Sequence, residues 1–346
     1  MLPNTPGSTG RPPPPRQPWN ASICVREMTR ITPLPHKHPF YNVLMEATRV
    51  RFVFTDLLRT VAPALDAGAK PQPCVSVHHS LRVAYIALRV ARLVFLPERE
   101  SADLVTLALL RDIGVTPDAP YNTPAHCRQG ERALRTLACP AFPADVLRCH
   151  HENYDGTGLL GLYGQHIPLP AQILRLADVV STQFNMAEAY RNAGLRHRIA
   201  DDVRDRNGTV YSPETADAFL HLTQQSAFWY ELTDPVVDHA LALRCPQMPI
   251  DLSYRDIHQI TRGLAAVMRA RKNSAGASVR GRRTSGHIAR WALSHRMDKD
   301  VIRKMLISED LRMLGIVVPG YALETVPGFG PTVQSEQTVS PASRVS

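Results

Sequence analysis

His-His-Glu (150–152) opens the stretch that decides how this chain is interpreted, and Gln-Ile-Leu-Arg-Leu-Ala-Asp (172–178) closes it. Two adjacent imidazoles stand at its start, and a carboxylate stands at its end inside an apolar helical pattern. Imidazoles and carboxylates together suit a divalent transition metal. The glycine-rich loop between them suits an anionic substrate. The stretch therefore indicates a helical domain that carries a metal centre.

Three upstream residues are candidates for the same centre. His79 begins a helical pattern, Asp112 ends an apolar run, and His126 begins another predicted helix. A buried Asp is costly unless it is paired, hydrogen-bonded or bound to a metal. Two such Asp residues and four His residues at helix ends or in apolar runs therefore favour one shared polar centre over separate core residues.

The bulk composition describes a chain with enough apolar residues for a core. At 346 residues it has room for about two domains, taking roughly 150 residues per domain. Six cysteines lie scattered without a Cys-x-x-Cys pair, so neither a disulfide framework nor a zinc ribbon is indicated. We expect reduced thiols in a cytoplasmic protein, because the N-terminus has no hydrophobic segment of the signal-peptide type.

The most apolar stretch, 81–96, is interrupted by Arg82, Arg89 and Arg92. These residues and Tyr85 lie on one stripe of a helix. The pattern predicts an amphipathic helix packed against the core. No stretch has the 18 or so apolar residues that a membrane span needs, so no membrane partner is expected.

Composition divides the chain into four predicted segments. Apolar spacings of three and four predict helices through the second segment, with at most a small hairpin at 159–167. The segments are a disordered Pro-rich arm (1–38), a helical domain (39–249), a shorter helical segment (250–320) and a disordered tail (321–346).

The motifs quoted above resemble bacterial HD-GYP domains, a subgroup of the HD metal-dependent phosphohydrolases. The resemblance spans roughly 78–187 and is most specific over 150–178. It implies an all-α fold with two or three metal ions, iron or manganese, and hydrolysis of cyclic di-GMP in many members. It also implies that Asp112 bridges two metals that activate a water. The metal ligands carried over to this chain are His79, Asp112, His126, His150, His151 and Asp178.

This chain departs from the HD-GYP pattern at several positions. Arg111 stands where the family has the His of its His-Asp pair, and Val115 stands where a phosphate-binding Lys is expected. The Gly-Tyr-Pro signature is replaced by Gly-Leu-Leu at 158–160. Val75 replaces the Glu of three-metal members, so a three-metal centre is not expected. Arg111 and Gly158 remain candidates for substrate contact.

Arg111 leaves two interpretations open. A guanidinium cannot give up its proton to bind a metal, and it could instead neutralise Asp112 and Asp178. The domain would then be degenerate, with a regulatory or ligand-sensing role and with part of the metal or none. Alternatively, one metal is held by Asp112, His126, His150 and Asp178 while Arg111 grips a phosphate, which describes a weakly active metal-dependent phosphodiesterase.

The C-terminal third carries a further alternative. Residues 251–319 resemble the opening of a second HD domain, with Glu309 in the place of the His, and the segment cannot form a complete metal site by itself. Positions 255–304 hold 13 Arg and Lys against 3 Asp and Glu. This basic block could serve a DNA-binding regulator with a helix-turn-helix at 287–306. A cyclic dinucleotide or another phosphoester is the favoured partner, nucleic acid is the less favoured one, and a homodimer is left open.

Overall fold

The computed structural model describes residues 49–67, 78–137 and 143–253, with 255–256, 259–260 and 263–264. Helices dominate these residues, which confirms the predicted all-α class. The predicted arm (1–38), the tail (321–346) and most of the segment 250–320 lie outside the described residues. The elements are β1 (Arg49–Val53), α3 (Phe54–Ala67), α4 (His79–Leu93), α5 (Glu98–Leu110), α6 (Pro124–Thr136), α7 (Ala144–Cys149), η1 (Gly164–His166), α8 (Leu169–Gln183), η2 (Ala189–Arg191), α9 (Ala193–Asp205), α10 (Pro213–Thr223), α11 (Ser226–Glu231), α12 (Val237–Arg244) and β2 (Pro249–Ser253).

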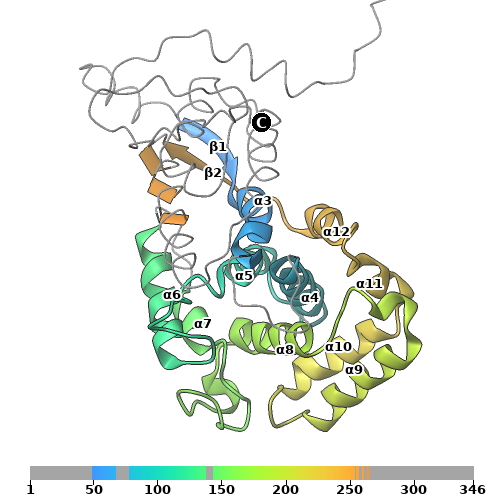
Figure 1. The fold of residues 1–346 in the computed structure, drawn as a ribbon. Helices are drawn as coiled ribbons and strands as arrows, with labels where there is room; N and C mark the ends of the chain where they lie inside the picture. The colour runs from blue at the N-terminus through green and yellow to red at the C-terminus, as the bar shows by residue number, and fades with distance from the viewer. Residues whose placement is uncertain are drawn as a thin grey trace, which may run out of the picture.

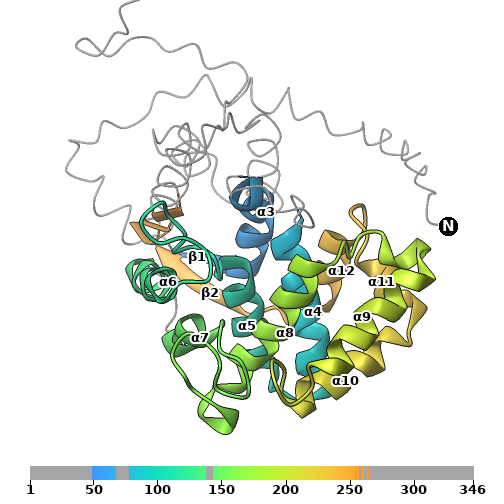
Figure 2. The same cartoon turned by 60° about the horizontal axis from the view of Figure 1, so that its bottom comes forward.

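Helix α4 is the centre of the fold. It packs against α3, α5 and α8 on one side and against α10 and α12 on the other (Figures 1 and 2). Twelve of its residues are buried, including Leu88 and Val90. Helix α7 packs against α8, and α6 packs against the other side of α7 (Figure 1). No helix among the described residues is long and apolar enough to cross a membrane.

The polar stripe predicted on α4 is a packing surface in the structure. Arg82 is 2% exposed, donates a hydrogen bond to Leu232 O and forms an ion pair with Asp234. Arg89 forms an ion pair with Glu231 at 3.3 Å. The stripe therefore faces the segment around α11, because buried guanidinium groups need carboxylate and carbonyl partners.

Two strands differ from the predicted run of helices. β1 pairs with β2 in antiparallel orientation, with Arg49 opposite Ser253. β2 crosses the predicted boundary at 249/250. The small hairpin that the sequence allowed at 159–167 does not form, and η1 lies there instead. The physical reason is that the Glu152 carboxylate accepts hydrogen bonds from the backbone N–H groups of Leu160 and Leu162, so that these donors do not pair with a strand.

The turn after α5 touches α6 through two glycines. A Cβ added to Gly114 would lie 2.2 Å from Gly130 N and 2.3 Å from His126 O. Helix α6 itself begins at Pro124, and the N-cap hydroxyl of Thr123 accepts a hydrogen bond from His126 N. This close backbone contact positions His126 next to the end of α5.

We expect Gly114→Ala to lower the free energy of unfolding by about 3 kcal/mol, because overpacking against rigid backbone forces α6 to move. Urea denaturation measures the loss. Gly194→Ala is the control, since its Cβ would meet its nearest neighbour, Asn192 Oδ1, at an ordinary 3.5 Å. Equal stability of the two variants would show that the contact at Gly114 is not tight in solution.

Candidate metal centre

The structure brings all six predicted metal ligands together where five helices meet. His79 is the first residue of α4, and Asp112 lies directly after the end of α5. His126 lies in the first turn of α6, and Asp178 lies within α8. The pair 150–151 follows the last residue of α7. A continuous series of side-chain contacts links these residues, and it divides into two halves.

The first half, here called the arginine half, consists of His79, Arg111, Asp112 and Asp178. Arg111 Nε donates to Asp178 Oδ1 at 2.7 Å, and its Nη2 lies 3.0 Å from Asp112 Oδ2. His79 Nε2 lies 3.5 Å from Asp178 Oδ1. Arg111 is only 1% exposed. The guanidinium therefore lies between two carboxylates. It occupies the position at which the HD-GYP pattern has a metal-binding imidazole.

Charge pairing favours the ionised forms of Arg111 and Asp178 despite their burial. Burial alone would raise the pKa of Asp178, but Arg111 and His79 hold it well below its usual value. Burial alone would lower the pKa of Arg111, but Asp112 and Asp178 raise it above its usual value. Buried charges persist when each has a partner of opposite sign.

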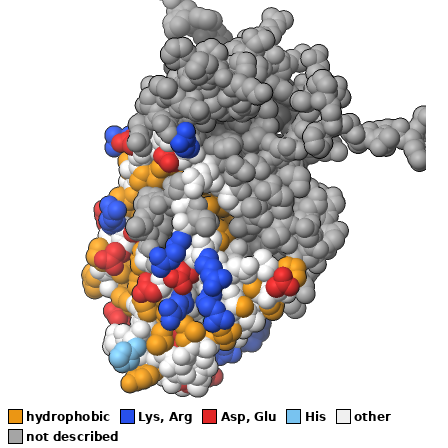
Figure 3. Space-filling model, turned by 90° about the vertical axis from the view of Figure 1, so that its left-hand side faces the viewer, with side chains coloured by type: hydrophobic (Ala, Val, Ile, Leu, Met, Phe, Trp, Pro, Cys, Tyr) orange, Lys and Arg blue, Asp and Glu red, His pale blue; other side chains and the backbone are white. Residues whose placement is uncertain are grey.

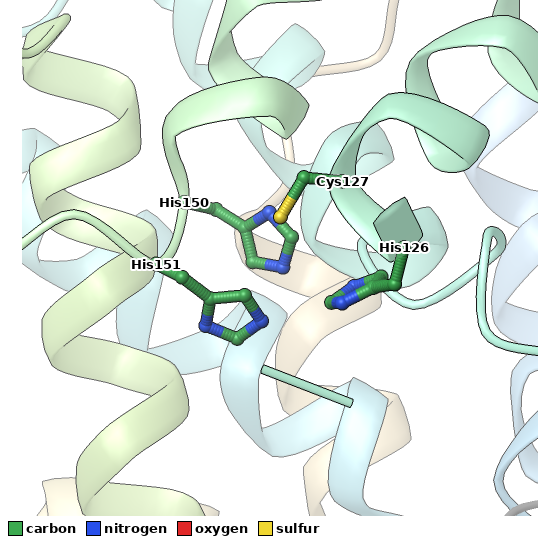
Figure 4. A group of neighbouring side chains, drawn as sticks. All are labelled: His126, Cys127, His150 and His151. Carbon is green, nitrogen blue, oxygen red and sulfur yellow. The ribbon is translucent and has the colours of Figure 1, made fainter. Parts of the chain in front are cut away.

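The second half, here called the histidine half, consists of His126, His150 and His151 (Figure 4). The ring centroids of His150 and His151 are 4.0 Å apart, and that of His126 lies 5.1 and 5.0 Å from them. Asp112 links the two halves, because its Oδ1 lies 3.7 Å from His126 Nε2 while its Oδ2 faces Arg111.

The three imidazoles are neutral and face one another. Burial, followed by the neighbouring His150, lowers the pKa of His126 to about 4. Burial also lowers the pKa values of His150 and His151. His150 Nδ1 donates to Leu147 O at 2.6 Å, because a carbonyl can only accept. This bond places the lone pair of His150 on Nε2, the tautomer that a metal requires.

The histidine half fits a metal ion. Within the described part of the chain, both ring nitrogens of His126 and the Nε2 atoms of His150 and His151 are buried without a hydrogen-bond partner. Such atoms are costly in a folded protein unless something binds them. The arginine half is different, since the carboxylates that would hold a second metal already contact Arg111.

Several neighbours of the centre were not assigned roles from the sequence. Ser80 Oγ accepts from Arg111 Nη1 at 3.1 Å, and Ser181 Oγ lies 3.0 Å from His79 Nδ1. Asp66 on α3 accepts from Ser80 N at 2.9 Å. Ser80 could have been found by its position next to His79. Asp66 carries no such signal, because it belongs to a helix without any family motif.

Cys127 and Arg175 also border the histidine half. Cys127 offers a sulfur within 4.8 Å of the ligand atoms of the three imidazoles. Arg175 donates to Asn153 Oδ1 at 2.8 Å, and its Nη1 lies 3.5 Å from His151 Nδ1. Burial raises the pKa of the Cys127 thiol to about 12. The sequence signal for Cys127 is its position directly after His126.

Gly158 lies in the loop that leaves the histidine half. A Cβ there would lie 2.6 Å from Glu152 Cα and 2.7 Å from Asn153 N. The position therefore needs a glycine so that the loop can pass close to Glu152. The Glu152 carboxylate accepts hydrogen bonds from Leu160 N and Leu162 N in the same loop. Contact of Gly158 with a substrate stays a prediction. Val75 lies outside the described residues.

The described side chains on the face shown in Figure 3 include basic and acidic groups side by side, with hydrophobic groups between them. The basic block 255–304 lies outside the described residues apart from 255–256, 259–260 and 263–264. The DNA-binding alternative and the second HD-like segment therefore stay predictions.

Comparison with known proteins identifies the type of domain. The family model described as the HD domain matches residues 77–183. A cyclic di-GMP phosphodiesterase of Thermotoga maritima is 25% identical over 201 residues, which cover 53% of this chain and 54% of that protein. The cyclic di-GMP phosphodiesterase response regulator RpfG of Xanthomonas campestris is 31% identical over 159 residues, which cover 40% of this chain and 41% of that protein. The chain thus spans about half or less of the length of these curated relatives.

A solved structure has the same fold. It is the crystal structure of a cyclic GMP-AMP specific phosphodiesterase of Vibrio cholerae (V-cGAP3), with a TM-score of 0.56 at 18% sequence identity. The alignment covers 76% of this chain and 70% of that chain. This similarity concerns the fold.

Proposed function

Because residues 77–183 form an HD domain, we propose that this chain is a regulatory module that binds a cyclic dinucleotide or a related phosphodiester and hydrolyses it slowly or not at all. The observation that carries the proposal is the position of Arg111 between Asp112 and Asp178. The relatives named above are phosphodiesterases of cyclic dinucleotides, which supports this class of ligand.

Arg111 supplies the positive charge that a metal ion would supply, but it cannot activate a water molecule as a metal ion does. A guanidinium between two carboxylates neutralises them and keeps α5 and α8 together. It cannot lower the pKa of a bound water as a metal ion does, because it offers no empty orbital to an oxygen. Arg111 is only 1% exposed, which disfavours direct contact between its guanidinium and a phosphate. A ligand could still bind while its hydrolysis is lost.

The histidine half would hold one metal ion through His126, His150 and His151, and Asp112 lies beside them. When bound, such an ion supplies positive charge that attracts the anionic phosphodiester. Arg175, close to His151, adds a positive charge at the same place. The residues of this half therefore serve to bind and orient the ligand.

A second function, a slow metal-dependent phosphodiesterase, is favoured by one observation. The buried imidazole nitrogens without partners provide a site for a single metal in the described part of the chain. One metal can act as a Lewis acid by itself, although it cannot clamp both the attacking and the leaving oxygen as a two-metal site does.

The two functions are separated by measuring binding and turnover on the same preparation. We expect isothermal titration calorimetry of the full chain to detect cyclic di-GMP binding, while chromatography detects little or no linear product with manganese or iron present. His126→Ala should weaken the binding, and His197→Ala, an exposed residue on α9, should not. Turnover as fast as that of an active HD-domain enzyme run in parallel would favour the phosphodiesterase. Absence of binding to cyclic dinucleotides and to related phosphodiesters would contradict both functions.

A further inference from the structure

Cys127 is placed as a fourth donor to the histidine half. Its side chain is 2% exposed and belongs to helix α6, directly after His126. The sulfur and one ring nitrogen from each of the three imidazoles lie within 4.8 Å of one another. Figure 4 shows the sulfur beside the ring of His150, on the side of the cluster that faces α6.

The three imidazoles provide the independent sign that something binds here. His126 and His150 are fully buried, and His151 is nearly so. His126, His150 and His151 each keep at least one buried nitrogen without a hydrogen-bond partner within the described ranges. Polar atoms in this condition point to a ligand that the protein is built to hold.

We propose that this chain binds zinc through His126, Cys127, His150 and His151. The inference rests on the proposed function in one respect, namely that the histidine half holds a metal. A mixed set of thiolate and imidazole ligands suits zinc, whereas manganese prefers carboxylate and water ligands. On binding, the Cys127 thiol releases its proton to solvent and the resulting thiolate forms the Zn–S bond.

Asp112 is the competing fourth ligand, and its contacts argue against it. Its Oδ1 lies 3.7 Å from His126 Nε2, but its Oδ2 is 3.0 Å from Arg111 Nη2. A carboxylate that neutralises a buried guanidinium is poorly available to a metal. Cys127 has no such ion pair to give up.

Four protein ligands have a consequence for catalysis. Zinc sites with four protein ligands are closed and structural, while catalytic zinc sites keep one position for water. Coordination by Cys127 would therefore leave no position at which a water could be activated. The zinc would instead join α6 to the end of α7 and shape the binding site for the ligand.

Cobalt substitution tests this coordination directly. The full chain is stripped of metal by a chelator under reducing conditions and titrated with Co²⁺, and its absorption spectrum is recorded. We expect a thiolate-to-cobalt charge-transfer band in the near ultraviolet, together with intense visible bands of a tetrahedral ion. Elemental mass spectrometry of untreated protein should find zinc in preference to iron and manganese.

Three variants test whether the charge-transfer band arises from Cys127. Cys127→Ala and Cys127→Ser should lose the charge-transfer band, and Cys127→Ser keeps the shape of the side chain in case the smaller residue destabilises α6. Cys149→Ala is the matched control, because Cys149 is also buried and precedes His150 but is not among the four grouped residues. This variant should keep the band.

The outcomes separate the inference from the proposed function. A band that persists without Cys127, or cobalt bound by the unaltered chain without any such band, would overturn the assignment of Cys127. Failure of the unaltered chain to bind cobalt or zinc would overturn the metal site as a whole. Binding and turnover of cyclic di-GMP are measured separately, so the loss of either leaves the spectroscopic result intact.

Discussion

Arg111→His is expected to add a second metal ion per chain and to raise the rate of cyclic di-GMP hydrolysis by about tenfold or more, equivalent to about 1.4 kcal/mol or more of transition-state stabilisation. The substitution removes the cation between Asp112 and Asp178 and supplies an imidazole in its place. His79 already lies 3.5 Å from Asp178, so a full set of ligands would surround the new ion.

The measurement is metal content by elemental mass spectrometry, with linear product followed by chromatography. Arg111→Gln is the matched control, because it removes the charge without supplying an imidazole. A gain in metal with Arg111→His alone would show that the missing imidazole limits the centre. Equal gains in both variants would show that repulsion by the guanidinium limits it. Unchanged metal content in Arg111→His would contradict the ligand set carried over from the family.

Asp178→Ala is expected to lower the free energy of unfolding by about 3–5 kcal/mol, because it leaves a buried guanidinium short of one partner. Arg111 is almost completely buried, and Asp178 accepts its shortest hydrogen bond at 2.7 Å. His79 would lose the same carboxylate. Urea denaturation followed by circular dichroism measures the change.

Two comparisons make this result specific. Asp238→Ala breaks the pair with Arg59, but Asp238 is 56% exposed, so we expect a loss of about 1 kcal/mol or less. Replacing both partners, as Arg111→Met with Asp178→Leu, should recover much of the stability lost in Asp178→Ala, because it removes the buried charge along with its partner. A loss below about 1 kcal/mol in Asp178→Ala would contradict the view that the ion pair holds α5 to α8.

The motifs predicted the helical class correctly. The candidate site residues lie together because His79, His126 and Asp178 are at helix ends or in apolar runs, where a polar side chain faces a shared interior, and their role as metal ligands stays a prediction. The sequence allowed at most a small hairpin at 159–167, and none forms, because the carboxylate of Glu152 accepts hydrogen bonds from the backbone N–H groups of Leu160 and Leu162. The pairing of 49–53 with 249–253 was missed, since neither segment signals a partner so far away in sequence.

The sequence by itself determined the candidate ligands, the substitution of Arg111 for an imidazole and the loss of the Tyr and Pro after Gly158. Only the tertiary structure decided what Arg111 does, because its partner Asp178 is 67 residues away and on another helix. It also decided that Cys127 faces the imidazoles. The physical reason is that residue types establish which chemistry is available, whereas the packing of α5, α6 and α8 around α4 determines which groups are buried together and must satisfy one another.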